Sequence, residues 1–265
     1  MGAFYLDASQ QHEHHEIRKE RARDDLYQLS QDLSVRLNHN IKTALLMKGV
    51  IQSNPSLSQA NFNEMASAFF DPLIDLINVG ASPNFILSFI YPLEGNEAAL
   101  GMDFRLHPKQ LMSALEAKQK RKMVLNGPLM LKQGGSGIIA RVPVFINEGS
   151  TNESFWGLVS TVIDTESLLS NSGFTAADLP FELAIESISS DHLSHAVFLG
   201  DPLLLDEFDL ENTISVPSGY WHFVAKLPTS FSLPGDITHQ RKMSFFIGIA
   251  LTFSLLLFLR LSQKG

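Results

Sequence analysis

The sequence predicts an α+β protein with a long N-terminal stalk helix, two tandem mixed or antiparallel sheets, and a C-terminal transmembrane helix. Three observations support this. The segment 11–51 has apolar residues at helical spacing and no proline. Two groups of short β-rich runs follow, separated by turn residues. The charge-free apolar segment 243–259 follows these runs near the C-terminus. Helices and strands segregated along a chain in this way are typical of the α+β class.

Composition excludes several classes of protein. The chain has 265 residues, a net charge of −8 and no cysteine. Nucleic-acid-binding domains carry a basic footprint, so we expect no nucleic-acid partner. Without cysteine there is no disulfide, thiolate metal site or cysteine nucleophile. The sequence also lacks a P-loop, a G-x-S-x-G elbow and an H-E-x-x-H motif. We therefore expect neither an enzyme nor a cofactor.

The stalk helix over 11–51 carries one apolar stripe, formed by Leu26, Leu29, Leu33, Leu37, Ile41, Ala44 and Met47. Asn40 falls on a heptad position of the stripe, where asparagine can set the register of a dimer. The stripe suits either the seam of a homodimer or the face that packs on the rest of the chain. The run "HEHHE" at 12–16 is expected to be a solvated helix end and not a metal site.

A membrane-distal lobe is expected over 52–175. Proline, glycine and hydrophobic patterning predict its elements in this order: a helix over 58–80, a strand over 85–93, a helix over 108–121, three strands within 123–164 and a short helix over 164–170. The Gly-rich run 132–138 lies between two strands, so we expect a hairpin turn and not a nucleotide-binding loop.

A smaller membrane-proximal lobe is expected over 176–235. Its predicted strands are 181–187, 195–201, 211–217 and 220–228.

The apolar segment 243–259 has 17 residues without a charge. As a helix it would be roughly 26 Å long, the lower end of what a bilayer core requires. Basic residues flank it on both sides, so a transmembrane helix over 239–262 is predicted, with a buried core helix as the alternative. No signal peptide precedes the stalk and six residues follow Leu259, so we expect a piece of a longer protein.

The run "AALGMDFRL" at 98–106 places one carboxylate, Asp103, in an otherwise apolar stretch. A buried carboxylate needs hydrogen-bond donors. Asp103 could be exposed or cap the following turn. Alternatively, its donors could come from a ligand held in an apolar cleft.

Four segments, "YPLEGNEAALGMDF" (91–104), "VLNGPLMLKQGGSG" (124–137), "ARVPVF" (140–145) and "FWGLVSTVIDTESLL" (155–169), occur in this order. Together they resemble the CHASE domain, an extracytoplasmic sensory domain of bacterial histidine kinases, diguanylate cyclases and plant cytokinin receptors. The flanking architecture is also similar to that of the family, which implies that the two tandem mixed or antiparallel sheets are PAS-like. The resemblance implies a membrane-anchored, periplasmic small-molecule sensor in the cytoplasmic membrane, which relays binding to a cytoplasmic output absent from this chain. A ligand-free dimerising scaffold is the alternative.

The same resemblance implies site residues. Asp103 matches the aspartate that pairs with the adenine ring in the cytokinin receptors, and Leu125 matches a backbone contact. Ser160 and Thr161 replace two pocket glycines, which narrows the cavity and disfavours isopentenyl-adenine. An adenine-like ligand is one candidate, and a homodimer is expected.

Overall fold

The computed structural model describes residues 2–70, 75–131, 135–174, 179–190 and 194–228, with side chains from Glu16 onward. The described residues up to Leu227 form one compact unit. The predicted membrane helix over 239–262 lies outside the described residues. Within the described ranges, no helix is both long and apolar enough to span a bilayer.

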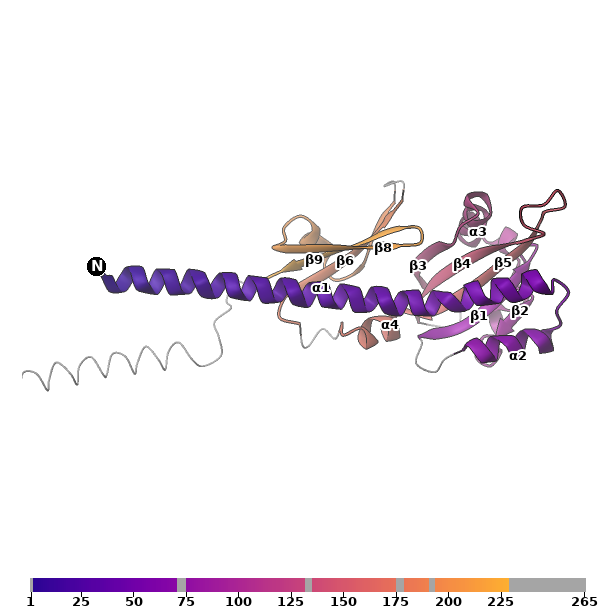
Figure 1. Cartoon of the computed structure of the whole chain (residues 1–265), viewed down its shortest axis with the longest axis horizontal. Coiled ribbons are helices and arrows are strands. Elements are labelled where there is room, and N and C mark those ends of the chain that lie inside the picture. Colours follow the sequence, from indigo (N-terminus) through magenta and orange to yellow (C-terminus); the bar gives the residue numbers. More distant parts are fainter. Residues whose placement is uncertain (1, 71–74, 132–134, 175–178, 191–193, 229–265) are drawn as a thin grey trace, which may run out of the picture. The chain divides into compact units, whose positions relative to one another are not determined.

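The predicted stalk is a single helix, α1 (Gly2–Ser53). The residues of its apolar stripe are buried against the sheets of the same chain, apart from the partly buried Leu29. The stripe is therefore the domain-packing face of the helix. Of the two alternatives left open by the sequence, intrachain packing is the one found. Figure 1 shows α1 running alongside the strands of both sheets.

The first sheet has five antiparallel strands in the order β2-β1-β5-β4-β3. They are β1 (Leu76–Pro83), β2 (Phe89–Tyr91), β3 (Val124–Met130), β4 (Ser136–Ile146) and β5 (Ser154–Asp164). The three strands expected within 123–164 are confirmed. The Gly-rich run joins the antiparallel neighbours β3 and β4, although 132–134 lie outside the described residues.

The predicted helix over 58–80 is wrong in its second half. The helix α2 (Gln59–Phe69) ends early, and β1 begins at Leu76. Six of the eight residues of β1 are buried, so the strand lacks the alternation of a half-exposed strand. The strand predicted over 85–93 is also shorter, because Asn84 and Phe85 have positive φ and turn the chain before β2.

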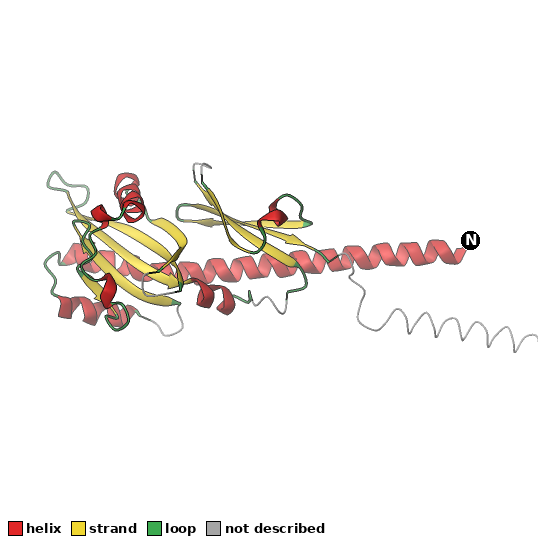
Figure 2. Ribbon diagram, turned by 180° about the vertical axis from the view of Figure 1, so that it is seen from behind, coloured by secondary structure: helices red, strands yellow, loops and turns green. Residues whose placement is uncertain are grey.

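The two faces of the first sheet are covered by different elements. One face packs on α1 and α2. The other is covered by the segment from Phe85 to Phe104 and by α3 (Pro108–Lys120), whose initial proline was predicted. Figure 2 shows α1 behind this sheet and α3 in front of it. Successive residues of a strand face opposite sides of the sheet. Only every second residue of each strand therefore points toward α3.

The second sheet has four antiparallel strands in the order β7-β6-β9-β8, confirming the four predicted runs. They are β6 (Glu182–Ser189), β7 (His195–Leu199), β8 (Leu210–Val216) and β9 (Gly219–Lys226). The short helix α4 (Thr165–Asn171), which was predicted, precedes them, and Asp164 caps it by accepting a hydrogen bond from Ser167 N at 2.7 Å. Trp221 anchors the core between this sheet and α1.

Candidate functional site

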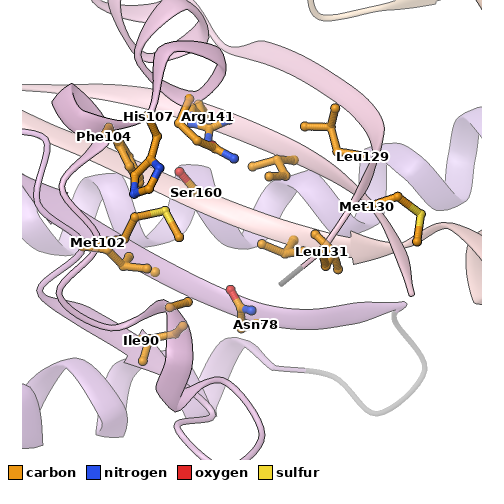
Figure 3. Close-up of a pocket in the computed structure, with 16 residues that line it drawn as sticks. Asn78, Ile90, Met102, Phe104, His107, Leu129, Met130, Leu131, Arg141 and Ser160 are labelled. Carbon is orange, nitrogen blue, oxygen red and sulfur yellow. The ribbon is translucent and has the colours of Figure 1, made fainter. Parts of the chain in front are cut away.

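A cavity of about 270 Å³ lies between the first sheet and the elements that cover its α3 face. Most of its lining is apolar. The lining residues are Asn78, Gly80, Leu87, Ile90, Ala99, Met102, Phe104, His107, Gln110, Leu129, Met130, Leu131, Ile139, Arg141, Ser160 and Val162. Figure 3 shows Arg141, Ser160 and His107 toward one end and Met130 and Leu131 toward the other. A hollow with mostly apolar walls and a few polar groups is typical of a small-molecule site.

The strand register explains why these residues share one face. Arg141 pairs with Ser160, Ser160 pairs with Gly80, and Gly80 pairs with Ile90, so one row crosses β4, β5, β1 and β2. Gly80 helps to keep the hollow open. A Cβ built there would lie 2.6 Å from Leu87 Cδ1 and would have to displace that side chain.

Arg141 is the main polar feature of the cavity. Its side chain is buried, with 2% of the residue exposed. Nη2 donates to Gln110 Oε1, and the guanidinium lies 5.3 Å from the ring centroid of Phe104. Nε and Nη1 have no hydrogen-bond partner among the described residues. Burial lowers the pKa of this guanidinium to about 10, so it is still a cation at neutral pH.

Ser160 lies opposite Arg141 and is also unsatisfied. It is 7% exposed, and its Oγ has no hydrogen-bond partner in the described part of the chain. Among the described residues, the lining contains no aspartate and no glutamate. A buried cation with free donors, a neighbouring hydroxyl and no counterion in this part of the chain form a site suited to an anionic group.

Asp103 is not among the residues that line the cavity, although its neighbours Met102 and Phe104 are. Its carboxylate accepts from Arg105 Nη2 at 2.7 Å, Arg105 Nε at 2.8 Å and Arg105 N at 3.0 Å. The side chain of Arg105 therefore holds the pKa of Asp103 below its usual value. The donors come from within the chain, and Asp103 caps the turn Phe104–Leu106. Among the roles that the sequence left open for Asp103, the described contacts are those of a turn cap.

Leu125 and Thr161 lie on the other face of the sheet. They belong to the row Leu125, Ala140, Thr161 and Val79, whose residues pack toward α1. Ser218 of the second sheet donates through Oγ to Leu125 O at 3.0 Å and accepts from Leu125 N at 3.1 Å. Of the four residues predicted for the site, only Ser160 lines the cavity. Ser160 and Thr161 are adjacent in one strand, so they face opposite sides.

Arg141 was missed as a site residue, although it stands in the quoted run "ARVPVF". A detectable signal was present. It is the one charged residue of β4, whose central residues are all buried, so it needs a partner as Asp103 did. Among described residues, no group of three or more histidines and acids could hold a metal ion. The side chains of His12 and His15 are outside that set.

A long helix that carries two antiparallel sheets is a fold shared with several ligand-binding domains of bacterial receptors. An extracellular ligand binding receptor from Desulfohalobium retbaense is similar over 77% of this chain and 39% of its own, with 12% identity and a TM-score of 0.58. This chain thus spans about two fifths of that protein. The ligand-binding domain of the Pseudomonas aeruginosa PAO1 chemoreceptor PctB, in complex with L-Arg, is similar over 81% of this chain and 98% of its own. The sequence identity is 12% and the TM-score is 0.53.

The sensory domain of the Campylobacter jejuni chemoreceptor Tlp3 matches 80% of this chain and 94% of its own, with 12% identity and a TM-score of 0.52. At such identities these likenesses show the fold. The sequence itself matches the CHASE domain over residues 34–198, so the chain belongs to the CHASE domain family, as its motifs predicted. No curated protein matches the sequence.

Proposed function

We propose that this chain is a membrane-anchored, extracytoplasmic sensor module that binds a small molecule in the cavity of its first sheet. The observation that carries the proposal is the pair Arg141 and Ser160, whose buried polar atoms face an apolar hollow without partners. Buried polar atoms in folded proteins are nearly always hydrogen-bonded. A ligand that satisfies both residues would be stabilised by charge-assisted hydrogen bonds and by burial of its apolar surface.

The strands of the cavity also supply a route for the signal. Arg141 faces the cavity, while its neighbours Ala140 and Val142 on β4 face the cores that contain α1. A ligand that favours one arrangement of β4 and β5 therefore also favours one position of the stalk helix. Such a relay requires that the ligand bind the two arrangements with different affinity. The output domain would belong to the longer receptor.

A second link joins the stalk to the strands. Asp75, buried just before β1, accepts from Arg36 Nε at 2.7 Å and from Asn40 Nδ2 at 3.1 Å. Asn171 at the end of α4 donates to the same carboxylate at 2.8 Å. This network ties α1, β1 and α4 together, so a shift of one is transmitted to the others.

The proposed location and anchoring are supported by the family and by the sequence. The family is that of a sensory domain, and the apolar segment 243–259, which lies outside the described residues, has the length and charge pattern expected of a membrane helix. We place the sensor in the periplasm, anchored in the cytoplasmic membrane. The scaffold alternative relied on the apolar stripe of α1 as a dimer seam, and that stripe is taken up by intrachain packing.

The experiment is a thermal-shift screen of the full chain in detergent against neutral, cationic and anionic small molecules. A ligand of the cavity raises the melting temperature of the wild type. The same ligand does not raise the melting temperature of Ala99→Phe, because the phenyl ring fills the cavity from the segment that covers it. The matched control is Ala196→Phe on the exposed part of β7, which should respond as the wild type does. A shift retained in Ala99→Phe would mean that the compound binds elsewhere.

A further inference from the structure

We infer that the ligand is a small organic carboxylate with an apolar body and no ammonium group. This inference rests on the proposed function, because it names the chemical class that the same cavity would accept. It is argued from the charges, the hydrogen-bonding groups and the volume of the cavity.

The anionic group follows from the state of Arg141. Two of its guanidinium nitrogens lack partners, and its one side-chain partner, Gln110, is neutral. A desolvated cation is strongly stabilised by a charge of opposite sign placed within hydrogen-bond distance. Guanidinium is also the side chain best suited to carboxylate recognition. Ser160 Oγ, on the opposing strand, adds one more donor toward the same anion.

The absence of an ammonium group follows from what the lining lacks. None of the lining residues that the structure describes is an aspartate or glutamate, and the carboxylate of Asp103 is outside the lining and paired with Arg105. An amino acid bound through Arg141 would bring its ammonium into an apolar cavity beside a like charge, with no anionic partner. The site therefore selects against zwitterions and in favour of simple monoanions.

The apolar body follows from the walls and the volume. Eleven of the sixteen lining residues are apolar or glycine, from Leu87 on the covering segment to Val162 on β5. A volume of about 270 Å³ corresponds to roughly nine water molecules at liquid density, so the ligand is of the order of ten non-hydrogen atoms. Branched or linear aliphatic carboxylates of four to six carbons are of this size.

The test is a calorimetric titration of the full chain in detergent with matched probe sets. One set is 4-methylpentanoate, its neutral amide 4-methylpentanamide, and L-leucine, which is the same skeleton with an added ammonium. Butanoate and hexanoate, each with its amide and 2-amino acid, form two further sets. The variants are Arg141→Met, which removes the charge at similar volume, and Lys122→Met, which removes an exposed charge away from the cavity.

In at least one set, the carboxylate is expected to bind wild type and Lys122→Met at least 30-fold more tightly than its amide or amino acid. Arg141→Met should lose that preference. A loss of this order is typical when one partner of a desolvated charge pair is removed. If an amide or amino acid binds as tightly as its carboxylate, and Ala99→Phe blocks it, the carboxylate inference is overturned and the sensor proposal stands.

If no carboxylate binds, the inference is likewise overturned. The broader thermal-shift screen then separates the two proposals. A neutral or cationic compound that depends on the cavity supports the sensor proposal alone, whereas a screen without any cavity-dependent compound overturns that as well.

Discussion

Arg141 and Ser160 lie directly opposite each other on β4 and β5, and both present polar atoms without partners to one apolar hollow. Directly opposed residues of an antiparallel pair have Cβ atoms only about 5 Å apart. A single ligand group can therefore contact both side chains. The same register sends Thr161 and Leu125 to the α1 side, where they belong to the core.

Arg141→Met should stabilise the unliganded chain. Burial lowers the pKa of Arg141 to about 10, which corresponds to about 3 kcal/mol of unfavourable free energy for the charged form. Replacing a buried charge by an apolar side chain of similar volume often raises stability by about 1–4 kcal/mol. Denaturant unfolding of the wild type and the variant measures the difference. A large loss of stability in the variant would show that Arg141 is there to support the fold.

Arg36→Met is the contrasting substitution and should destabilise the chain. Arg36 forms an ion pair with Asp75, whose side chain is 1% exposed. Removing the arginine leaves a buried carboxylate supported only by amide donors, a change that costs about 3 kcal/mol or more. The same unfolding titration should therefore shift in the opposite direction from that of Arg141→Met. If both substitutions changed the free energy of unfolding in the same direction and by the same amount, the presence or absence of an ion pair would not explain the effect of either arginine on stability.

Carboxylate binding should weaken in the alkaline range, where Arg141 loses its charge. Burial holds the pKa of folded Arg141 at about 10, below its value in the unfolded chain. The burial penalty is therefore fully present below about pH 10 and fades as the pH rises above that value. Affinity for a carboxylate should be constant near about pH 8 and fall roughly tenfold per unit above about pH 10, while an amide shows no such fall. Titrations at several pH values would reveal the break, and its absence would count against a charge contact.

Asp103→Ala distinguishes a turn-capping residue from a ligand contact. In the structure Asp103 pairs with Arg105 and caps the turn that carries Phe104 into the cavity wall. We expect Asp103→Ala and Arg105→Ala to weaken ligand binding by the same small factor, since both loosen one turn. If Asp103→Ala abolishes binding while Arg105→Ala does not, Asp103 contacts the ligand directly, as the family resemblance implied.

Ser160→Ala and Thr161→Val test which residues of β5 face the cavity and which face α1. Ser160→Ala should weaken binding by about 1 kcal/mol, the usual worth of one hydrogen bond. Thr161 is fully buried on the opposite face and its hydroxyl has no partner in the described structure. Thr161→Val should therefore leave affinity unchanged and keep or raise stability. Calorimetry and thermal unfolding of both variants provide the check, and a reversed pattern of affinities would contradict the assigned faces.

Leu33→Asp and Leu46→Asp separate folding from dimerisation. Leu33 is fully buried against the chain's own core, whereas Leu46 is 49% exposed on the same helix. Leu33→Asp should unfold the domain because it buries an unpaired charge. Leu46→Asp should leave the fold intact, and it should weaken a homodimer if the outer face of α1 forms one. Light scattering measures dimerisation and circular dichroism measures folding. A folded, monomeric Leu33→Asp variant would indicate that the apolar stripe of α1 is a dimer interface after all.

Local sequence patterns predicted most of the fold. Heptad spacing identified the stalk, and turn residues separated seven of the nine strands correctly. The failures have a physical cause. The strand Leu76–Pro83 is buried on both faces, so its apolar run is not distinguishable from a helix by periodicity. The stripe of α1 has the same pattern whether its partner is a second chain or the sheets of its own.

The site was harder to predict than the fold. Asp103 attracted attention as a lone acid, but its partner Arg105 stands two residues away and satisfies it locally. Arg141 has no such neighbour in sequence, and only the strand register shows that it faces a hollow beside Ser160. The family motif pointed to Ser160, which lines the cavity, and to its neighbour Thr161, which side-chain alternation places on the opposite face of β5.

The most direct measurement is a crystal structure of the chain with the tightest-binding carboxylate probe. The account predicts the carboxylate in the cavity of the first sheet, with an oxygen about 2.8 Å from Nε or Nη1 of Arg141 and the apolar body among Leu87, Ile90 and Val162. A probe found outside this cavity, or inside it with Arg141 still unpaired, would contradict the account.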